Sequence, residues 1–131
     1  MTLFIVKREG DRVQFSSDSR ITFGDAGYID KGIKLFAVPF RIKEPASKRE
    51  DFDKWAYQTQ FGLAVVGSSI NAYSVKDAIS EVLNNITAVT NLSDVSIPTI
   101  GELVLKVYKE VSEDLTPILN KNGLSEIILG G

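Results

Sequence analysis

The sequence predicts an α+β domain in which two long helices cover an antiparallel sheet. Four strand-like segments fill the first half of the chain, two amphipathic helical segments follow them, and a short apolar strand-like segment comes last. Separate groups of strands and helices are typical of α+β proteins, whereas α/β proteins alternate the two. A length of 131 residues with 44% hydrophobic content suffices for one domain with its own core.

The first third of the chain predicts a β-hairpin over residues 2–7 and 12–17. The run from Leu3 to Val6 is apolar and partly β-branched, and the second segment alternates polar with apolar side chains. Glu9-Gly10-Asp11 between them favours a turn, so the two segments are expected to pair. Thr2 would then open a central strand.

A third and a fourth strand are expected over residues 33–40 and 60–66. A glycine-containing loop at 24–27 precedes the third strand, and Lys34 lies at its start. Both segments are apolar with β-branched and aromatic side chains, and Gly67 closes the fourth, as is typical of strands.

A polar excursion over residues 43–59 separates these two strands. It is highly charged but contains Trp55 and Tyr57, and we expect an exposed hairpin extension or a short helical turn. The two aromatic side chains would either anchor a flap that contacts a partner or substrate, or pack on the body of the domain.

The second half of the chain changes from strand to helix periodicity. Apolar side chains recur at helical spacing from Ile70 to Val89, with Ser68 or Ser69 available as the N-cap. Pro98-Thr99 opens a second helix, because proline is favoured in the first helical turn. The two helices are expected to pack side by side, and Glu126–Leu129 predicts a last strand.

The composition excludes several classes of function. A net charge of −2, with 15 basic residues spread among 17 acidic ones, argues against a nucleic-acid partner. The chain contains no cysteine and no histidine. Disulfides, thiolate or imidazole metal sites, cysteine nucleophiles and Ser-His-Asp triads are therefore excluded, and we expect neither metal nor cofactor. Any general base must be a carboxylate, an amine or a tyrosine.

The chain predicts no secretory or membrane segment. Its first apolar run is ended by Lys7-Arg8-Glu9 before a secretory core could form. No apolar run approaches the length needed to span a bilayer, so we expect no membrane partner. A cytoplasmic location is the expectation.

Three residues at regular intervals form a candidate catalytic group. Thr2 directly follows Met1, Asp18 lies in Ser17-Asp18-Ser19-Arg20, and Lys34 lies at the start of the predicted third strand. If Met1 is removed, Thr2 carries a free α-amine and so combines a nucleophile with a general base. Each residue alone is ordinary, because second-position threonines, Asp-Ser turns and lysines are common.

The order of elements and this constellation resemble the N-terminal nucleophile (Ntn) hydrolases, within them the proteasome β subunits and the bacterial proteasome-like peptidases. That family uses an opening threonine, an aspartate in an Asp-Ser-Arg-like turn and a lysine at the start of the third strand. Thr2, Asp18 and Lys34 match these positions once the first methionine is set aside. Ser19 and Arg20 match the turn that supports the aspartate.

Gly67 matches the family's oxyanion position. It lies where a strand is expected to end and a helix to begin, within Ala64-Val65-Val66-Gly67-Ser68-Ser69. The family has a second glycine where this chain has Ser68. By the resemblance, the Gly67 amide would stabilise the oxyanion. Glycine is also well tolerated at any strand-to-helix corner.

The resemblance implies both a fold and an activity. The fold would be a four-layer αββα sandwich, with residues 1–131 forming one Ntn-hydrolase-like domain truncated at its C-terminal half. The activity would be that of a threonine peptidase or amidohydrolase in which Lys34, paired with Asp18, adjusts the α-amine. The implied partners are a peptide or protein substrate, further copies of the chain in a homo-oligomer, and a regulatory partner.

Two alternatives remain open. The first is a catalytically inactive, proteasome-like structural or assembly subunit. Retention of Met1 would favour it, because the Thr2 nitrogen would then lie in a peptide bond. The second alternative is an unrelated α+β binding module that resembles the family by chance.

Overall fold

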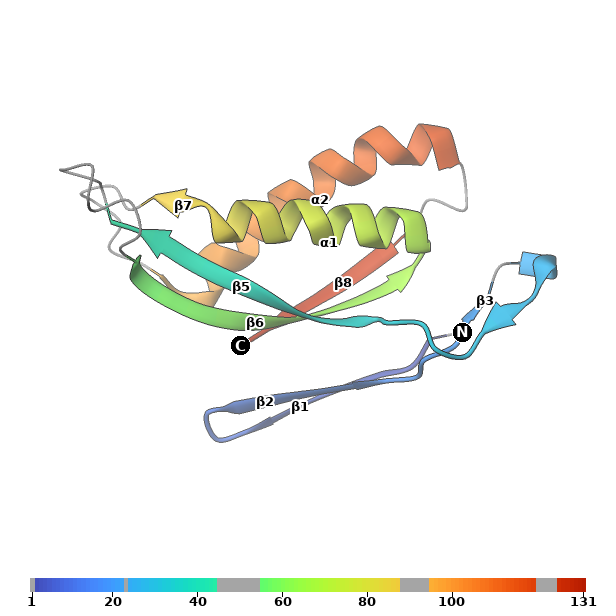
Figure 1. The fold of residues 1–131 in the computed structure, drawn as a ribbon, viewed down its shortest axis with the longest axis horizontal. Helices are drawn as coiled ribbons and strands as arrows, with labels where there is room; N and C mark the ends of the chain where they lie inside the picture. The colour runs from blue at the N-terminus through green and yellow to red at the C-terminus, as the bar shows by residue number, and fades with distance from the viewer. Residues whose placement is uncertain (1, 23, 45–54, 88–94, 120–124) are drawn as a thin grey trace.

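The computed structural model of the chain describes residues 2–22, 24–44, 55–87, 95–119 and 125–131. Within these ranges the fold is mixed α+β: a four-stranded sheet has two helices on one face and a β-hairpin on the other (Figure 1). The predicted class, an antiparallel sheet covered by two helices, is confirmed at this level.

The centre of the fold is the antiparallel pair β5 (Leu35–Lys43) and β6 (Trp55–Gly67). On its other side β6 pairs antiparallel with β8 (Ser125–Gly130), and β5 pairs in parallel with β7 (Ile86–Thr87), giving the order β7-β5-β6-β8. Pro39 is compatible with β5 because, in the described part of the chain, β7 pairs only with the end of that strand.

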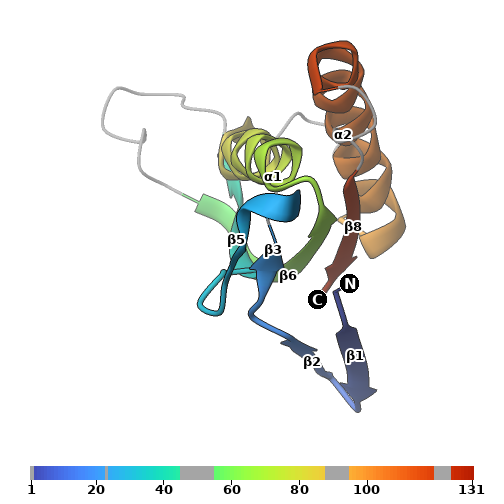
Figure 2. The same cartoon turned by 90° about the vertical axis from the view of Figure 1, so that its right-hand side faces the viewer.

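Two helices lie side by side on one face of this sheet (Figure 2). Helix α1 (Ser69–Asn84) begins behind Ser68, whose side chain caps it, and α2 (Ile97–Leu119) follows β7. The predicted N-cap and the predicted second helix are therefore confirmed. None of the helices described here is long and apolar enough to cross a membrane.

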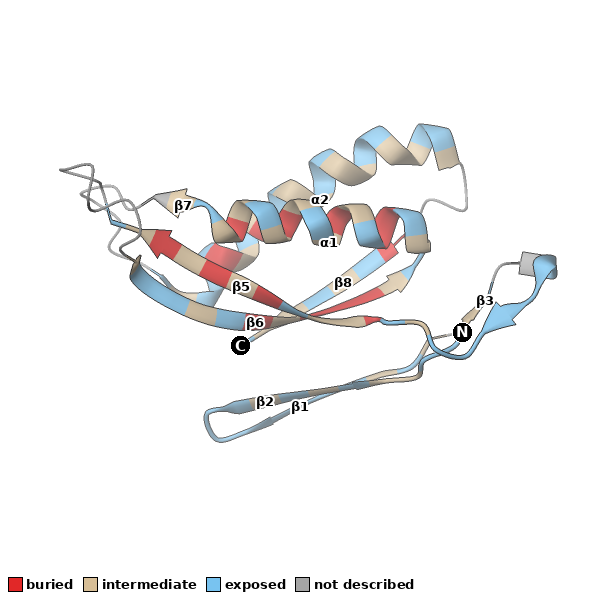
Figure 3. Ribbon diagram, in the orientation of Figure 1, coloured by how far each residue is buried: buried red, intermediate tan, exposed pale blue. Residues whose placement is uncertain are grey.

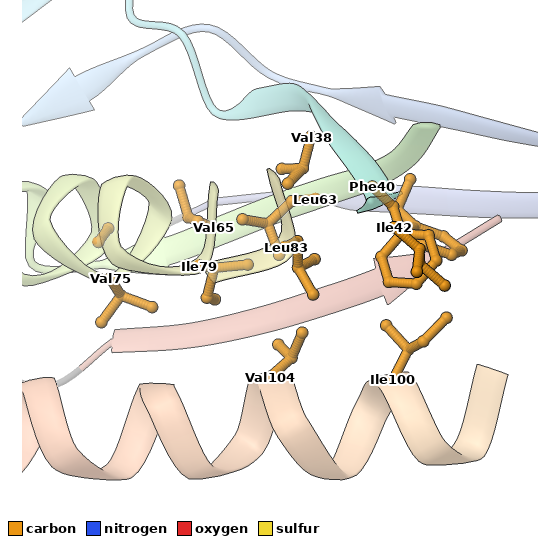
Figure 4. Close-up of a cluster of buried hydrophobic side chains, with 12 residues drawn as sticks. Val38, Phe40, Ile42, Leu63, Val65, Val75, Ile79, Leu83, Ile100 and Val104 are labelled. Atoms are coloured by element: carbon orange, nitrogen blue, oxygen red, sulfur yellow. The ribbon is translucent and has the colours of Figure 1, made fainter. Parts of the chain in front are cut away.

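The core lies between the helices and the sheet. Alternate side chains of β5 and β6 point to the helices because side chains of a strand alternate between its two faces. Figure 3 shows this as buried bands on both strands and along α1. Figure 4 shows the contacts of the cluster between the sheet, α1 and α2. Its buried members are Val38, Phe40, Ile42, Phe61, Leu63, Val65, Ala72, Val75, Ile79, Leu83, Ile100 and Val104.

A β-hairpin packs on the opposite face of the sheet. Strands β1 (Phe4–Glu9) and β2 (Arg12–Ser17) pair antiparallel, as predicted, around a turn in which Gly10 has φ +63°. The hairpin contacts the sheet through Phe15, whose ring lies against Gly62 of β6. A Cβ atom at Gly62 would be 2.3 Å from that ring, so only glycine allows this close approach.

Thr2 does not open a central strand, and that prediction was wrong. The hairpin forms its own two-stranded sheet, and β1 begins at Phe4. Just before Phe4, the Leu3 amide donates to a side chain instead of a backbone carbonyl. Its acceptor is Asp18 Oδ1, at 2.8 Å. Thr2 therefore lies just outside the strand, next to Asp18.

The loop predicted at 24–27 contains more order than expected. A 3-10 helix, Gly24–Ala26, lies between two short strands, β3 (Ile21–Thr22) and β4 (Tyr28–Ile29), which pair with each other. These strands form a small sheet of their own beside the N-terminal segment. Local pairing of this kind is too short to predict from periodicity.

The aromatic residues of the predicted excursion belong largely to the sheet. Trp55 and Tyr57 begin β6, and the Tyr57 ring meets Phe40 edge-on with centroids 5.9 Å apart. The cations of Arg41 and Lys43 lie over the Trp55 ring, at 5.2 and 5.3 Å from its centroid. These rings therefore pack on the body of the domain. The part of the prediction that concerns residues 45–54 lies outside the described residues.

Helix α1 ends at Asn84, before the predicted end at Val89. Asn85 forms the C-cap, and Ile86 and Thr87 then pair with the end of β5 as strand β7. Asparagine is a poor helix former, and β-branched residues favour strands, so the chain leaves the helix where Ile86 can pack against the core.

The first prediction concerns the contact between the hairpin and the sheet. Replacing Gly62 with alanine should lower the free energy of unfolding by about 1–3 kcal/mol, because the Phe15 ring must move away from the added methyl group. The matched control is Gly101→Ala in α2, where a Cβ atom has nothing within 4 Å. That change should instead stabilise the protein by about 0.5–1 kcal/mol. Urea denaturation measures both values, and a Gly62→Ala variant as stable as the original chain would contradict the contact.

Candidate active site

The structure brings Thr2, Asp18 and Lys34 together. The Lys34 ammonium donates to Asp18 Oδ2 at 2.7 Å and to Thr2 Oγ1 at 3.3 Å. Lys34 is only 6% exposed, which is unusual for a lysine. Lys34 thus lies within hydrogen-bonding distance of both Asp18 and Thr2.

The end of the hairpin places Thr2 beside Asp18. The Asp18 amide donates to the Leu3 carbonyl at 3.2 Å, and the Leu3 amide donates to Asp18 Oδ1 at 2.8 Å. The carboxylate therefore has two separate partners, the Leu3 amide on one oxygen and the Lys34 ammonium on the other. This double contact fixes the backbone next to the Thr2 hydroxyl.

The pKa of Asp18 is lowered from its ordinary value of 3.8. The hydrogen bond from Lys34 is the largest cause, and the bond from the Leu3 amide adds to it, while partial burial acts in the opposite direction. A lowered pKa means that the folded state favours the carboxylate over the neutral acid. Asp18 thus stays ionised and keeps an ion pair with Lys34 in neutral solution.

Ser19 and Arg20 connect the Asp18 turn to the segment that precedes Lys34. The Ser19 hydroxyl donates to the Asp30 carbonyl, and Arg20 Nε donates to Asp30 Oδ1, both at 2.7 Å. The Gly32 amide donates to the Ser19 carbonyl, also at 2.7 Å. The expected supporting turn is therefore present, with Asp30 as a partner that sequence reasoning did not identify.

Gly67 forms the corner between β6 and α1. It is the last residue of β6, has φ +94° and is followed by the N-cap Ser68. Residues other than glycine rarely adopt this backbone conformation, so the corner favours glycine whether or not its amide has a catalytic role. The corner lines the same cavity as Thr2.

Helix α2 makes two polar contacts near this corner, one with α1 and one with β8. Asn71, in the first turn of α1 and 1% exposed, exchanges hydrogen bonds with Ser112 of α2, with its amide group donating at 3.3 Å. The Tyr108 hydroxyl donates to the carbonyl of Ser125, the residue that pairs with Gly67 across the sheet. Sequence reasoning did not identify this polar contact, because it joins residues far apart in the chain.

A cavity of about 240 Å³ opens beside the three residues. Thr2, Lys34 and Gly67 contribute to one part of its lining. Apolar side chains form most of the rest, including Ile21, Ile33, Val65 and Ala72. The volume suits a side chain or a short segment of a ligand better than a whole drug-sized molecule. Within the described residues no cluster of acidic side chains could hold a metal ion.

A scan against protein-family models found no match to this chain, and searches of curated proteins and of solved structures found none either. The function is therefore proposed from the geometry around Thr2 and from the resemblance of the sequence to the Ntn hydrolases.

The second prediction follows from the lowered pKa of Asp18. A carboxyl group with a lowered pKa stabilises the fold above its unfolded-state pKa, and this contribution is lost as the pH falls through the folded-state pKa. The Asp18→Asn variant should thus unfold more easily at pH 7, and its deficit should shrink as the pH drops below about 4. Chemical denaturation across this range measures the difference. Asp25→Asn, at an exposed position, is the control, and a deficit that does not change with pH would contradict the ion pair.

Proposed function

We propose that this chain is a threonine-type Ntn hydrolase that cleaves peptide or other amide bonds once Thr2 is its first residue. One observation carries the proposal: Lys34 Nζ lies 3.3 Å from Thr2 Oγ1 and 2.7 Å from Asp18 Oδ2, beside a cavity that Gly67 also lines. Catalytic groups need this proximity before they can act on a substrate.

The chemistry begins with the Thr2 hydroxyl as the nucleophile. It attacks the carbonyl carbon of an amide, and its proton passes to the Thr2 α-amine, directly or through water. A free α-amine ordinarily titrates at about 7.7–8.0. The Lys34 ammonium, paired with Asp18, favours the neutral amine and the ionised hydroxyl, so it keeps the base competent near neutral pH.

Later steps use the same groups. The oxyanion formed by the attack is stabilised by the Gly67 amide, which is the donor we assign from the corner between β6 and α1. Collapse of the intermediate breaks the C–N bond, and the leaving amine takes the proton from the α-ammonium. Water then hydrolyses the Thr2 ester and regenerates the free hydroxyl. The apolar lining of the cavity would hold a side chain of the substrate.

An inactive subunit of the same fold is the second candidate. Met1 precedes Thr2 in the chain, and while it is attached the Thr2 nitrogen is an amide without basicity. A chain that keeps Met1 would serve as a structural or assembly subunit. The two candidates share a fold and differ in the chemical state of one nitrogen.

The third prediction tests the nucleophile directly. A fusion partner whose removal leaves Thr2 first should yield a protein that forms a covalent adduct with a peptide epoxyketone, located at Thr2 by intact mass and peptide mapping. The same chain with Met1 attached should stay unmodified, because its base is absent. Lys34→Met should slow adduct formation by about 10²-fold or more, because the α-amine would no longer be kept competent as the general base, whose contribution is typically about 10²–10⁴-fold.

Two controls make this result decisive. Thr2→Ala should abolish the adduct, and Lys106→Met, which removes an exposed lysine of α2, should leave the rate unchanged. The absence of any adduct on the chain that begins with Thr2 would exclude the hydrolase and leave the inactive subunit. Intact mass of the chain from cells shows which state occurs there.

We also propose that the hairpin is the start of the second sheet of a four-layer αββα sandwich in a cytoplasmic homo-oligomer. It lies across the sheet from the helices (Figure 1), and its outer side carries Leu3 and Ile5, which are 63% and 58% exposed. Exposed apolar patches of this kind favour contact with further protein.

The fourth prediction concerns this assembly. Ile5→Lys should reduce the size of the assembly in analytical ultracentrifugation, because it places a charge on the apolar outer side of the hairpin. Gln14→Lys adds the same charge at a polar position on that side, opposite Lys7, and should leave the size unchanged. A chain that is monomeric at all concentrations would contradict the proposal.

A further inference from the structure

A tyrosine on α1 makes a hydrogen bond to the residue just before Lys34. The Tyr73 hydroxyl donates to the Ile33 carbonyl at 3.0 Å. The Tyr73 ring meets Phe36 edge-on, with centroids 5.8 Å apart and an interplanar angle of 77°. Phe36 belongs to β5, so the ring is fixed on the strand that follows Lys34 while the hydroxyl reaches back to the segment before it.

This hydrogen bond holds the backbone next to Lys34. The lysine lies just before β5 begins, so it lacks the regular pairing of that strand. Its own carbonyl accepts from the Val65 amide at 3.0 Å, which ties it to β6. The Tyr73 bond ties the preceding peptide to α1, so the backbone on both sides of the lysine Cα is held by a different element.

We propose that Tyr73 is a positioning residue that sets the location of the Lys34 ammonium relative to Thr2 and Asp18. The catalytic part of this inference rests on the proposed function. The structural part does not, because it concerns the placement of one side chain. The 3.3 Å contact with Thr2 Oγ1 is near the limit for a hydrogen bond, so a small shift of the lysine backbone would break it.

Tyr73 also lines the cavity, and this offers a competing role. A residue that only contacts the substrate would change affinity and leave the chemical step intact. A positioning residue would change the chemical step, because misplacement by about 1 Å can cost up to 10²-fold in rate. The two roles are therefore separated by measuring binding and reaction independently.

The test uses Tyr73→Phe, which removes the hydroxyl and keeps the ring that packs on Phe36. The control is Tyr57→Phe, at the opposite end of β6 from Gly67. The first readout is the titration of the Asp18 carboxyl carbon by NMR in the full chain. Because Lys34 is the largest cause of the lowered pKa of Asp18, a misplaced lysine should raise that pKa toward its ordinary value. The control should leave it unchanged.

The second readout is the rate of epoxyketone adduct formation on the chain that begins with Thr2. We expect the limiting rate of Tyr73→Phe to fall about tenfold, with its half-saturating concentration within about twofold of the original. The rate should also reach half its maximum at a higher pH, because a more distant ammonium depresses the pKa of the α-amine less.

The two readouts separate the placement of Lys34 from its effect on the reaction. A shifted titration with an unchanged limiting rate would uphold the placement and overturn the catalytic part. An unchanged Asp18 titration overturns the inference, as does an effect confined to the half-saturating concentration. A shifted titration in a chain that forms no adduct would exclude the proposed hydrolase while upholding the placement of Lys34 by Tyr73. A shifted titration together with a slower limiting rate supports both.

Discussion

A lysine ammonium enclosed by protein needs a carboxylate within reach, and the ion pair between Lys34 and Asp18 meets this need at 2.7 Å. The lysine side chain is 7% exposed and the aspartate side chain 32%, so water compensates only the acid. Without Asp18, the ammonium would be a buried charge without its carboxylate partner, which is costly. The hairpin end, the Asp18 turn and the start of β5 therefore meet at one place, and Thr2 is carried there with them.

The elements themselves could largely be predicted, because each has a local signature. An apolar run, a turn signal and an alternating segment predicted the hairpin, and helical spacing predicted α1 and α2. The resemblance carried by Thr2, Asp18 and Lys34 implied that they form one group, and Lys34 does contact the other two. Contacts such as those of Asp30 and Tyr73 were not predictable, because tertiary packing alone decides which carbonyl or cation a polar side chain reaches. The prediction that Thr2 opens a central strand was wrong for the same reason, because tertiary packing decides which sheet the hairpin joins.

Polar contacts join α2 to α1 and to β8, beside the strand-to-helix corner at Gly67. Asn71 is almost fully buried, and Ser112 of α2 satisfies it. A buried amide without such a partner would be costly, so this pair fixes how the two helices lie together. The corner at Gly67 is connected to this pair in two ways, because α1 follows it in the chain and β8 pairs with it across the sheet. Changes in α2 would thus reach the cavity without touching its lining.

The hairpin differs from the rest of the fold in how it is held. A two-stranded sheet is marginally stable by itself, and here the Phe15 ring packed on Gly62 and the ion pair between Asp18 and Lys34 attach it to the rest of the fold. Such a unit can detach while the core between β5, β6 and α1 stays folded. The Thr2 hydroxyl would then lie beside Lys34 only in the docked fraction of molecules. Temperature, denaturant or a ligand that shifts this local equilibrium would change the fraction of molecules with an assembled site. It would do so under milder conditions than those that unfold the whole domain.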